Sequence, residues 1–352
     1  AVFLILGGGS IALSYYLSKK KTENPPGSED IESGVVEKSE EDLLELDWDD
    51  AGQVDVISIE LGYALIPLIE EERHGRLLHR AKGIRKKMSG DYGFLLPTIR
   101  IRDNLDIPPH RYQIVINGST RGRGDIELGK FLAINPGSVL ETVSGKEIKE
   151  PAFGLDAIWI DAKDKEYAQA VGYTVVDAST VIATHLNSAL RGNAEELLTY
   201  EIAQRLVDRV EETSPKLIEE LLPDNLPMSV LVKVLQNLLA EGVPIKDMRS
   251  ILETLSDVAP YTKSHDTLTN YVRAKLGRLI IQQLCDPLDT LEVMTLEPNL
   301  EQMLTDLVKS ASTIEEVTLE PNLAQTLIEA LSEEASAAQA NEKAAVLIVS
   351  PT

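Results

Sequence analysis

The sequence predicts a protein of mixed α/β and α class that is divided into several subdomains. With 352 residues, the chain is too long for one ordinary core and suggests two to four compact units. Strand-like and helix-like apolar patterns alternate up to about residue 193, helical spacing alone fills residues 194–283, and mixed patterns return after Asp286. We therefore expect an α/β subdomain with a smaller α/β unit inserted in it, then a helical subdomain, then a C-terminal α/β subdomain.

The composition excludes several classes of protein. The formal net charge of −23 argues against a nucleic-acid-binding protein, which needs a basic surface. A single cysteine, Cys285, rules out an internal disulfide, and its place in an apolar helical run predicts a small buried side chain. None of the five histidines has cysteine or carboxylate neighbours at the spacing of metal ligands, so we expect neither a metal nor a cofactor.

Residues 1–21 differ from the rest of the chain in being strongly apolar. Ala1–Leu17 carries no charge, and three lysines, Lys19–Lys21, follow it. About 17 residues is the lower limit for spanning a bilayer, and a signal peptide would carry its positive charge before the apolar stretch. Two interpretations remain, a buried or disordered leader and the distal part of a last transmembrane helix with its lysines on the cytoplasmic side. We favour the second, and the absence of an initiator methionine predicts a fragment.

An acidic linker is expected over residues 22–53. Fourteen acidic residues and one lysine lie between Glu23 and Glu60, a composition that does not form a packed core. Inside it, Asp42–Asp50 (DLLELDWDD) places Trp48 among leucines and acids. This segment is either a spacer with a short local helix or a docking segment, in which Trp48 and the leucines anchor while acids such as Glu45 and Asp50 add charge pairing.

The first α/β subdomain should cover residues 54–128 and continue at 178–193. VISIELGYALIPLI reads as a strand with a bend at Gly62. Residues 70–88 form a helix with an apolar face and a basic opposite face, which is either simply solvated or attracted to a neighbouring copy. Residues 98–102, 111–116 and 130–134 read as strands, and the glycine-rich NGSTRGRGD (117–125) as a hairpin tip rather than a phosphate-binding loop.

The smaller inserted unit should cover residues 129–177. Ala157–Ile160 and Thr174–Asp177 are expected strands, with a helix over 164–171 that stops at Gly172. Asp177 or Ser179 should cap the helix that follows.

Helices fill the next subdomain, residues 194–285. Three-to-four spacing predicts helices over 194–210, 230–242, 244–258 and 267–284, with Gly242 at a helix end and Pro244 at a helix start. The last subdomain, 286–352, contains two near-copies, TLEPNLEQMLTDL and TLEPNLAQTLIEAL. Each predicts a helix with Pro298 or Pro321 in its first turn, before a strand at Ala344–Val349.

Glu150–Asn187 carries the most specific pattern, EPAFGLDAIWIDAKDKEYAQAVGYTVVDASTVIATHLN. It resembles a signature of the FlhA/InvA/LcrD family of type III secretion export-gate proteins, and of its flagellar branch in particular. The resemblance covers roughly residues 40 to 350 and extends to four more motifs: GYALIPLI (62–69), FLLPTIRIRDNLDIPPHRYQI (94–114), LAINPG (132–137) and KVLQNLLAEGVPIKDMRSILETLSDVAP (233–260).

The resemblance implies a function in protein export. Family members lie in the bacterial inner membrane, with transmembrane helices before a cytoplasmic region. That region receives export chaperones with their substrates for flagellum assembly, works with other export-apparatus components and assembles into a ring of nine. The resemblance also implies that the small insertion is ferredoxin-like or RRM-like, that the linker contacts the neighbouring subunit, and that the last subdomain continues past residue 352.

A chaperone-docking site is implied at the junction of the first subdomain and its insertion. The family's shallow depression maps onto Phe153 and Thr184, with Glu150 where the family commonly has aspartate, so contact geometry there differs. Val175, Val176 and Val181 are expected to add apolar surface. The alternative for Phe153 is a core side chain. Gly62 is a candidate hinge because glycine can adopt backbone angles closed to other residues.

No catalytic constellation is evident, so we do not expect an enzyme. The aspartate pairs Asp161/Asp164 and Asp103/Asp106 have no partner base, and Ser179 and His185 lack an orienting acid. The alternatives to a flagellar export gate are a virulence-type export gate and a non-enzymatic membrane-tethered scaffold.

Overall fold

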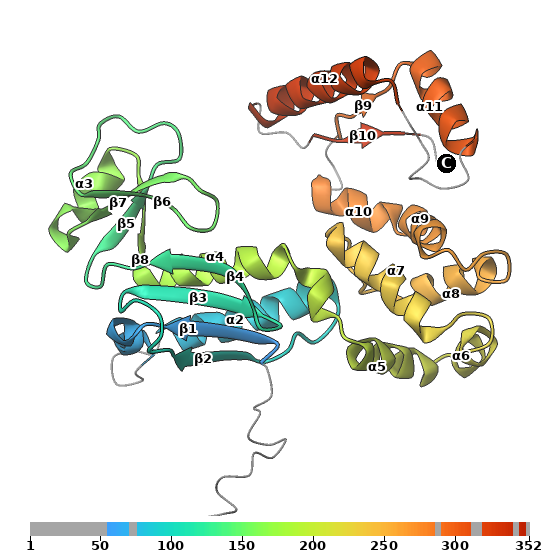
Figure 1. The fold of residues 1–352 in the computed structure, drawn as a ribbon, viewed down its shortest axis with the longest axis horizontal. Coiled ribbons are helices and arrows are strands. Elements are labelled where there is room, and N and C mark those ends of the chain that lie inside the picture. The colour runs from blue at the N-terminus through green and yellow to red at the C-terminus, as the bar shows by residue number, and fades with distance from the viewer. Residues whose placement is uncertain (1–54, 70–75, 286–289, 311–318, 341–344, 350–352) are drawn as a thin grey trace, which may run out of the picture. The chain divides into compact units, whose positions relative to one another are not determined.

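The computed structural model describes residues 55–69, 76–285, 290–310, 319–340 and 345–349 (Figure 1). All of them belong to one of two compact units of the chain, Val54–Thr352. The expected transmembrane segment and the linker residues Glu45, Trp48 and Asp50 lie outside the described residues. Within the described ranges, no helix has the length and apolar content needed to cross a bilayer.

The first sheet mixes parallel and antiparallel strands in the order β2-β1-β3-β4. β1 (Ile57–Leu61) is parallel to β2 (Ile99–Asp103) and antiparallel to β3 (Arg111–Ile116), which pairs with β4 (Ser119–Asp125). Helix α2 (Arg76–Tyr92) lies beside β2, helix α4 (Ala178–Arg191) lies beside β3 and β4, and the two helices pack against each other. All five side chains of β1 are buried, so this strand is at the centre of the core.

Two expectations for this sheet are wrong. The strand expected through Gly62 ends at Leu61, and Tyr63–Leu68 forms a 3₁₀ helix, η1, in its place. The glycine-rich segment expected as a hairpin tip is the strand β4. The turn is confined to Asn117 and Gly118, whose φ angles of 49° and 76° lie in the left-handed region that reverses a two-residue hairpin.

The second sheet has the order β6-β7-β5-β8, and all neighbouring strands are antiparallel. Its strands are β5 (Phe131–Ile134), β6 (Lys146–Lys149), β7 (Asp156–Ile160) and β8 (Thr174–Asp177). After the short 3₁₀ helix η3 (Ala162–Asp164), helix α3 (Lys165–Ala170) connects β7 to β8, whereas no helix connects β5 to β6. One side of the sheet, including Trp159, joins the main core, and the other forms a small separate core with α3.

The helical region begins after α4. It comprises η4 (Ala194–Leu197), α5 (Tyr200–Glu211), α6 (Pro215–Leu221), α7 (Met228–Ala240), α8 (Met248–Val258), α9 (His265–Lys275) and α10 (Gly277–Leu284). Its apolar side chains continue the core of the first sheet, so the two regions share one hydrophobic cluster.

Three of the expected helices start later or divide in the structure, and a capping side chain accounts for two of these differences. The helix expected over 194–210 breaks before Thr199, whose hydroxyl accepts the backbone N–H of Ile202 and starts α5. Asp247 caps α8, so Pro244 precedes that helix and does not start it. The helix expected over 267–284 divides at Leu276. Cys285 lies partly exposed at the end of α10, so the expected burial of its thiol is wrong.

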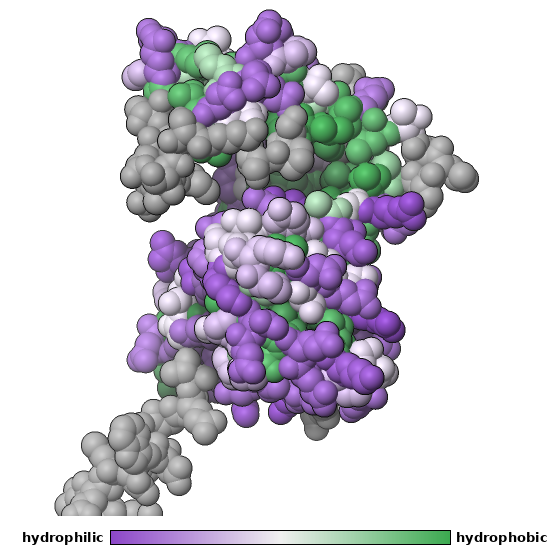
Figure 2. All heavy atoms as spheres, turned by 90° about the vertical axis from the view of Figure 1, so that its right-hand side faces the viewer, coloured by the Kyte–Doolittle hydropathy of each residue, from purple (hydrophilic) through white to green (hydrophobic). Residues whose placement is uncertain are grey.

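The C-terminal region consists of two helices and a short parallel strand pair. β9 (Met294–Thr295) pairs with β10 (Leu347–Ile348), and α11 (Pro298–Ser310) and α12 (Pro321–Ala340) begin at the expected prolines. No described residue after Leu276 is buried. Hydrophobic side chains therefore remain exposed in this region (Figure 2), including Ile328, Ile348 and Val349.

Candidate docking site

The turn between β6 and β7 presents the candidate docking side chain. Lys149 and Asp156 form the last strand pair, and residues 150–155, which we call the Phe153 turn, connect them. The Glu150 N–H donates to the Leu155 carbonyl at 2.7 Å, and the Gly154 N–H donates to the Glu150 carbonyl at 2.8 Å. Gly154 has a φ of 73°, a conformation that favours glycine. These bonds close the turn tightly.

The Glu150 carboxylate organises the Phe153 turn from inside. Its Oε1 accepts the Ala152 N–H at 2.9 Å and its Oε2 accepts the Phe153 N–H at 2.8 Å. The residue is only 2% exposed. The expected surface contact from this carboxylate is therefore wrong, because both oxygens are already bonded within the turn. Glutamate is longer than the aspartate that the family commonly has here. Its carboxylate folds over the turn and bonds to the amides of the second and third residues after it.

The Phe153 side chain projects from this rigid turn into solvent. It is 67% exposed, and Leu155 on the same turn is 44% exposed. The alternative in which Phe153 is a core residue is therefore excluded. A fixed backbone carrying an exposed aromatic ring is what an anchor residue needs, because little conformational freedom is then lost on binding.

Helix α4 contacts the Phe153 turn through a side-chain hydrogen bond. The Ser188 hydroxyl lies 3.4 Å from the Ala152 carbonyl, to which it donates a hydrogen bond. Thr184 is one helical turn before Ser188, so both lie on the same face of α4, and Thr184 is partly exposed. This arrangement places Thr184 on the helix face that carries the turn.

The three valines contribute less surface than expected. Val181 is 2% exposed and packs in the main core, so the expectation that it supplies docking surface is wrong. Val181 lies one residue before Ile182 and five before Leu186 on α4, and all three belong to the buried face of this helix. Val175 and Val176 are half-buried on opposite faces of β8, packed against the small and the main core respectively.

A buried aromatic pair lies between α4 and the first sheet. A hydrogen bond of 2.8 Å joins Tyr112 Oη to His185 Nδ1, and the two rings meet edge to face with centroids 5.7 Å apart. Burial, together with the charge of Glu150, raises the pKa of Tyr112. Burial also lowers the pKa of His185, although the Glu150 carboxylate opposes that shift. His185 is therefore neutral at pH 7.

Two glycines of β4 make room for this pair. A Cβ on Gly122 would lie 2.5 Å from His185 Nε2, and a Cβ on Gly124 would lie 2.8 Å from the Tyr112 ring. The sequence interpretation missed Tyr112, His185 and Gly122 as parts of one site. The signal in the sequence was the Gly-x-Gly spacing of Gly122 and Gly124. Alternate residues of a strand face the same side, so two such glycines leave room there for side chains from another element.

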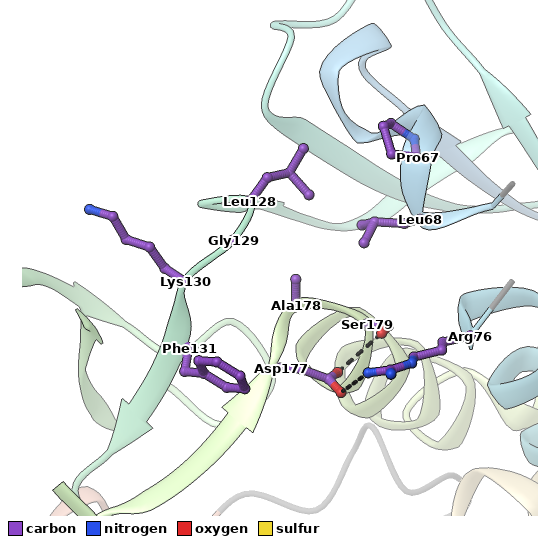
Figure 3. Close-up of a pocket in the computed structure, with 10 residues that line it drawn as sticks. All are labelled: Pro67, Leu68, Arg76, Leu128, Gly129, Lys130, Phe131, Asp177, Ala178 and Ser179. Carbon is purple, nitrogen blue, oxygen red and sulfur yellow. Dashed lines mark hydrogen bonds and ion pairs between the residues drawn. The ribbon is translucent and has the colours of Figure 1, made fainter. Parts of the chain in front are cut away.

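A pocket of about 250 Å³ lies where the second sheet joins the first (Figure 3). Its lining comes from the end of η1, the start of α2, the entry to β5 and the start of α4: Pro67, Leu68, Arg76, Leu128, Gly129, Lys130, Phe131, Asp177, Ala178 and Ser179.

Asp177 holds the start of α4 at this pocket. Its carboxylate accepts the Thr180 N–H at 2.7 Å and lies 3.3 Å from Arg80 and 3.8 Å from Arg76, so Asp177 rather than Ser179 is the cap. Burial alone would raise its pKa, but hydrogen bonds from Thr180 and Ser179 and the charge of Arg80 lower it. The pocket thus has one compensated carboxylate, one hydroxyl, from Ser179, and an otherwise apolar and cationic lining.

Gly62 has an ordinary backbone conformation. Its φ of −62° and ψ of 151° are accessible to any residue, so the reason first given for a hinge does not hold. Glycine is needed there for space, because a Cβ would lie 2.2 Å from the Pro108 carbonyl oxygen and 2.5 Å from that of Pro109.

Ser179 and His185, the pair considered for catalysis, are bonded to different partners. The Ser179 hydroxyl donates to Asp177, while His185 bonds to Tyr112, so the two do not pair. In the described part of the chain, no three histidine, cysteine or acidic residues are arranged to hold a metal ion.

Comparison with models of known protein families shows which family this chain belongs to. The model of the FHIPEP family matches residues 1–352. The chain belongs to the FHIPEP family. Its relatives include the flagellar biosynthesis proteins FlhA of Escherichia coli and Bacillus subtilis. The E. coli protein is 44% identical over 304 residues, 86% of this chain and 43% of that protein. The B. subtilis protein is 33% identical over 341 residues, 96% of this chain and 50% of that protein.

This FHIPEP chain spans half or less of those relatives. Its fold matches the Chlamydia pneumoniae CdsV protein with a TM-score of 0.68 at 22% identity, covering 82% of this chain and 84% of the other. The fold of this chain also matches the C-terminal domain of InvA with a TM-score of 0.55 at 19% identity, covering 79% of this chain and 83% of the InvA domain. The resemblance to the FlhA/InvA/LcrD family is thus confirmed.

Proposed function

We propose that this chain is the cytoplasmic part of the export gate of a flagellar type III secretion system. In this role it docks export chaperones with their substrates and directs the substrates to a channel in the inner membrane. FHIPEP membership and the FlhA relatives support the system, and the exposed Phe153 ring on its rigid turn is the single observation that supports docking. The role is one of binding and not of catalysis.

The flagellar assignment is favoured over a virulence-type export gate by sequence distance. The flagellar relatives described above are 33% to 44% identical to this chain, whereas CdsV and InvA, which share its fold, are 22% and 19% identical. A general membrane-tethered scaffold has no comparable support. A pulldown tests the choice. The immobilised chain should retain flagellar chaperone–substrate complexes and not virulence-type ones. Retention of virulence-type complexes alone would reverse the assignment.

The docking surface we propose centres on Phe153 and Thr184, with Leu155 on the same turn. Val175 and Val176 are further candidates for its edge, although each is half-buried on a different face of β8. Phe153 supplies the anchor, and the Thr184 hydroxyl on α4 supplies a polar contact. The buried Glu150 contributes by fixing the turn. Thr184→Met should obstruct this surface while leaving α4 folded, because the side chain is only partly buried.

Self-association through the acidic linker is part of the same proposal. A solved relative, the EscV cytosolic domain, is described as nonameric and has the fold of this chain with a TM-score of 0.59. We propose that this chain also forms a ring, with Trp48, Glu45 and Asp50 docking on the neighbouring copy. Another solved structure is a complex of CdsV with CdsO, which supports export-apparatus proteins as further partners.

The remaining architectural assignments are interpretations. We interpret residues 1–21 as the end of a transmembrane helix, which would place the folded part on the cytoplasmic side of the inner membrane.

We interpret the second sheet as a ferredoxin-like unit without its first helix, since its strand order and connections agree with that pattern. Gly62 remains a candidate pivot between β1 and η1.

A further inference from the structure

Helix α2 presents an exposed basic surface. Residues spaced three or four positions apart share one side of a helix. The exposed side of α2 is formed in this way by His79, Lys82, Gly83, Lys86 and Gly90, with Lys87 beside them. A Cβ on Gly83 or Gly90 would meet nothing within 4 Å, so the space above the helix is open. We call this surface the lysine face.

The other charged residues of α2 already have partners. Arg76 and Arg80 pair with Asp177, and Asp91, the one acid of the helix, pairs with an arginine of α4. Arg85 donates to two backbone carbonyls of the segment before β2. The three lysines have neither an ion pair nor a side-chain hydrogen bond with any described residue. Three positive charges are therefore free in a chain whose net charge is −23.

A free acidic surface lies on the helical region, where α5 ends and α6 follows. Between residues 211 and 224 the chain has five carboxylates and one lysine. All five acidic residues are exposed, and none of their side chains has an ion pair or a hydrogen bond among the described residues. We call this set the acidic face: Glu211, Glu212, Glu219, Glu220 and Asp224.

We propose that the lysine face of one copy of this chain docks on the acidic face of a second copy. The inference rests on the self-association proposed above and names the folded surfaces that meet. Two different surfaces of opposite charge give a head-to-tail contact, in which every copy uses both faces, as a closed ring requires. The charges orient the two copies and speed their encounter more than they add affinity.

The acidic linker is another acidic partner that the sequence offers, but the lysine face suits it less well. The linker is expected to dock through Trp48 and neighbouring leucines, which need an apolar pocket. The exposed row of α2 has no apolar side chain with which to form one. The acidic face, in contrast, is carried by α5, α6 and the turn after α6, so little conformational freedom is lost when it docks.

Charge reversal tests this contact in the full chain, kept in detergent, with sedimentation velocity as the measure of association. The first variant reverses the lysine face: Lys82→Glu, Lys86→Glu and Lys87→Glu. The second variant reverses the acidic face: Glu219→Lys, Glu220→Lys and Asp224→Lys. Within each variant the two faces then have the same sign, so association should weaken about tenfold or more.

An equimolar mixture of the two variants provides the rescue. The reversed lysine face of the first then meets the reversed acidic face of the second, and the unchanged faces also match. The mixture should therefore associate nearly as the parent does. The matched control carries the same change of charge on exposed lysines of other elements: Lys163→Glu, Lys233→Glu and Lys263→Glu. This control should associate as the parent does, and melting curves should show that all variants are folded.

Ionic strength is a second measurement that needs no variant. Association of the parent should weaken about tenfold or more between about 0.05 M and about 0.5 M salt, because exposed charges are screened. Association that does not change with salt would overturn the contact.

The outcomes separate this contact from the proposed ring. Parent-like association of both folded variants would overturn the contact, and an effect of Trp48→Ala in that case would leave the ring intact. Two weakened variants whose mixture does not recover would also overturn it, because the lysine face then meets another partner, such as the linker or an anionic lipid surface. A parent that does not associate at all would count against the contact and the ring together.

Discussion

At the scale of single residues, two buried glutamates are stabilised in different ways. Glu150 bonds to backbone amides of its own turn, whereas Glu60 on β1 bonds to side chains of a neighbouring strand and the loop after it. Glu60 accepts hydrogen bonds from Arg102 Nη2 at 2.6 Å and from Asn104 Nδ2 at 2.7 Å. Burial alone would raise the pKa of Glu60, but these bonds outweigh it, so its pKa is lowered. Its charge therefore helps to hold β1 and β2 together.

Glu60 predicts part of the acid sensitivity of the fold. A group with a lowered folded-state pKa stabilises the fold fully above its unfolded pKa, about 4.3 for glutamate, and loses this effect as the pH falls through its folded-state value. Glu60→Gln should therefore lower the melting temperature at pH 7 but flatten its decline between roughly pH 5 and pH 3. Thermal denaturation across that range measures both effects. The exposed Asp224→Asn is the control, and identical pH slopes for Glu60→Gln and the parent would contradict the assignment.

The residue scale also shows what the sequence could and could not reveal about the site. The resemblance located Phe153 and Thr184, and the structure brings the Phe153 turn and α4 together. The inward direction of the Glu150 carboxylate depends on the backbone of the turn, which the sequence pattern does not define. The burial of Val181 was available from the helical spacing of Val181, Ile182 and Leu186. The Tyr112–His185 pair joins residues 73 positions apart and could not be read from local patterns.

At the scale of elements, local signals predicted the regular helices and strands, and long-range contacts decided the exceptions. α2, β2, β3 and β7 follow their apolar spacing closely. β4 was missed because its inward positions are glycines, and those glycines are explained only by Tyr112 and His185 above them. β6 is short and carries three charged residues in KEIK, so its pattern resembles a loop.

Two glycines at different positions give opposite predictions for stability. Gly62→Ala would force a Cβ against the backbone carbonyls of Pro108 and Pro109, so the melting temperature should fall. Gly83→Ala in the exposed face of α2 should stabilise the fold by about 0.5–1 kcal/mol, since alanine favours helix and the space is open. Calorimetric melting of both variants is the measurement. If Gly62→Ala melts with the parent, the close packing of β1 against that loop is not as described.

The hinge proposal for Gly62 needs a separate readout. A pivot should change the distribution of subdomain arrangements as well as the melting temperature. Small-angle scattering of the parent and of Gly62→Ala in solution compares these distributions. Different scattering at a temperature where both are folded supports the pivot, while superimposable profiles leave Gly62 with a packing role alone.

At the scale of the whole molecule, charge is distributed unevenly along the chain. The acidic residues concentrated between Glu23 and Glu60 contrast with a helix, α2, that carries six arginines and lysines and one aspartate. Such a contrast favours attraction between copies and makes it sensitive to salt. Association should therefore depend both on an apolar anchor in the linker and on ionic strength.

Trp48 is the predicted apolar anchor for self-association. Trp48→Ala should weaken association by about 2 kcal/mol or more, roughly thirtyfold, if the ring is a hot spot. Sedimentation velocity over a range of protein concentrations, in detergent that keeps the apolar N-terminus in solution, measures the association constant. Ile31→Ala is a control in the same acidic stretch but outside Asp42–Asp50. Equal association constants for Trp48→Ala and the parent would rule out the docking role of the linker.

Docking through the Phe153 ring is the claim on which the proposed function depends most directly. Calorimetric titration of a flagellar chaperone–substrate complex into the chain tests it, with Phe153→Ala compared with the parent. Leu105→Ala is the matched control. Leu105 is also an apolar residue with a largely exposed side chain, 78%, but it lies in the loop between β2 and β3. Phe153→Ala should lose about 2 kcal/mol, roughly thirtyfold in affinity, with an unchanged melting temperature, and Leu105→Ala should bind as the parent does. Equal affinity of the folded Phe153→Ala variant and the parent would contradict the account.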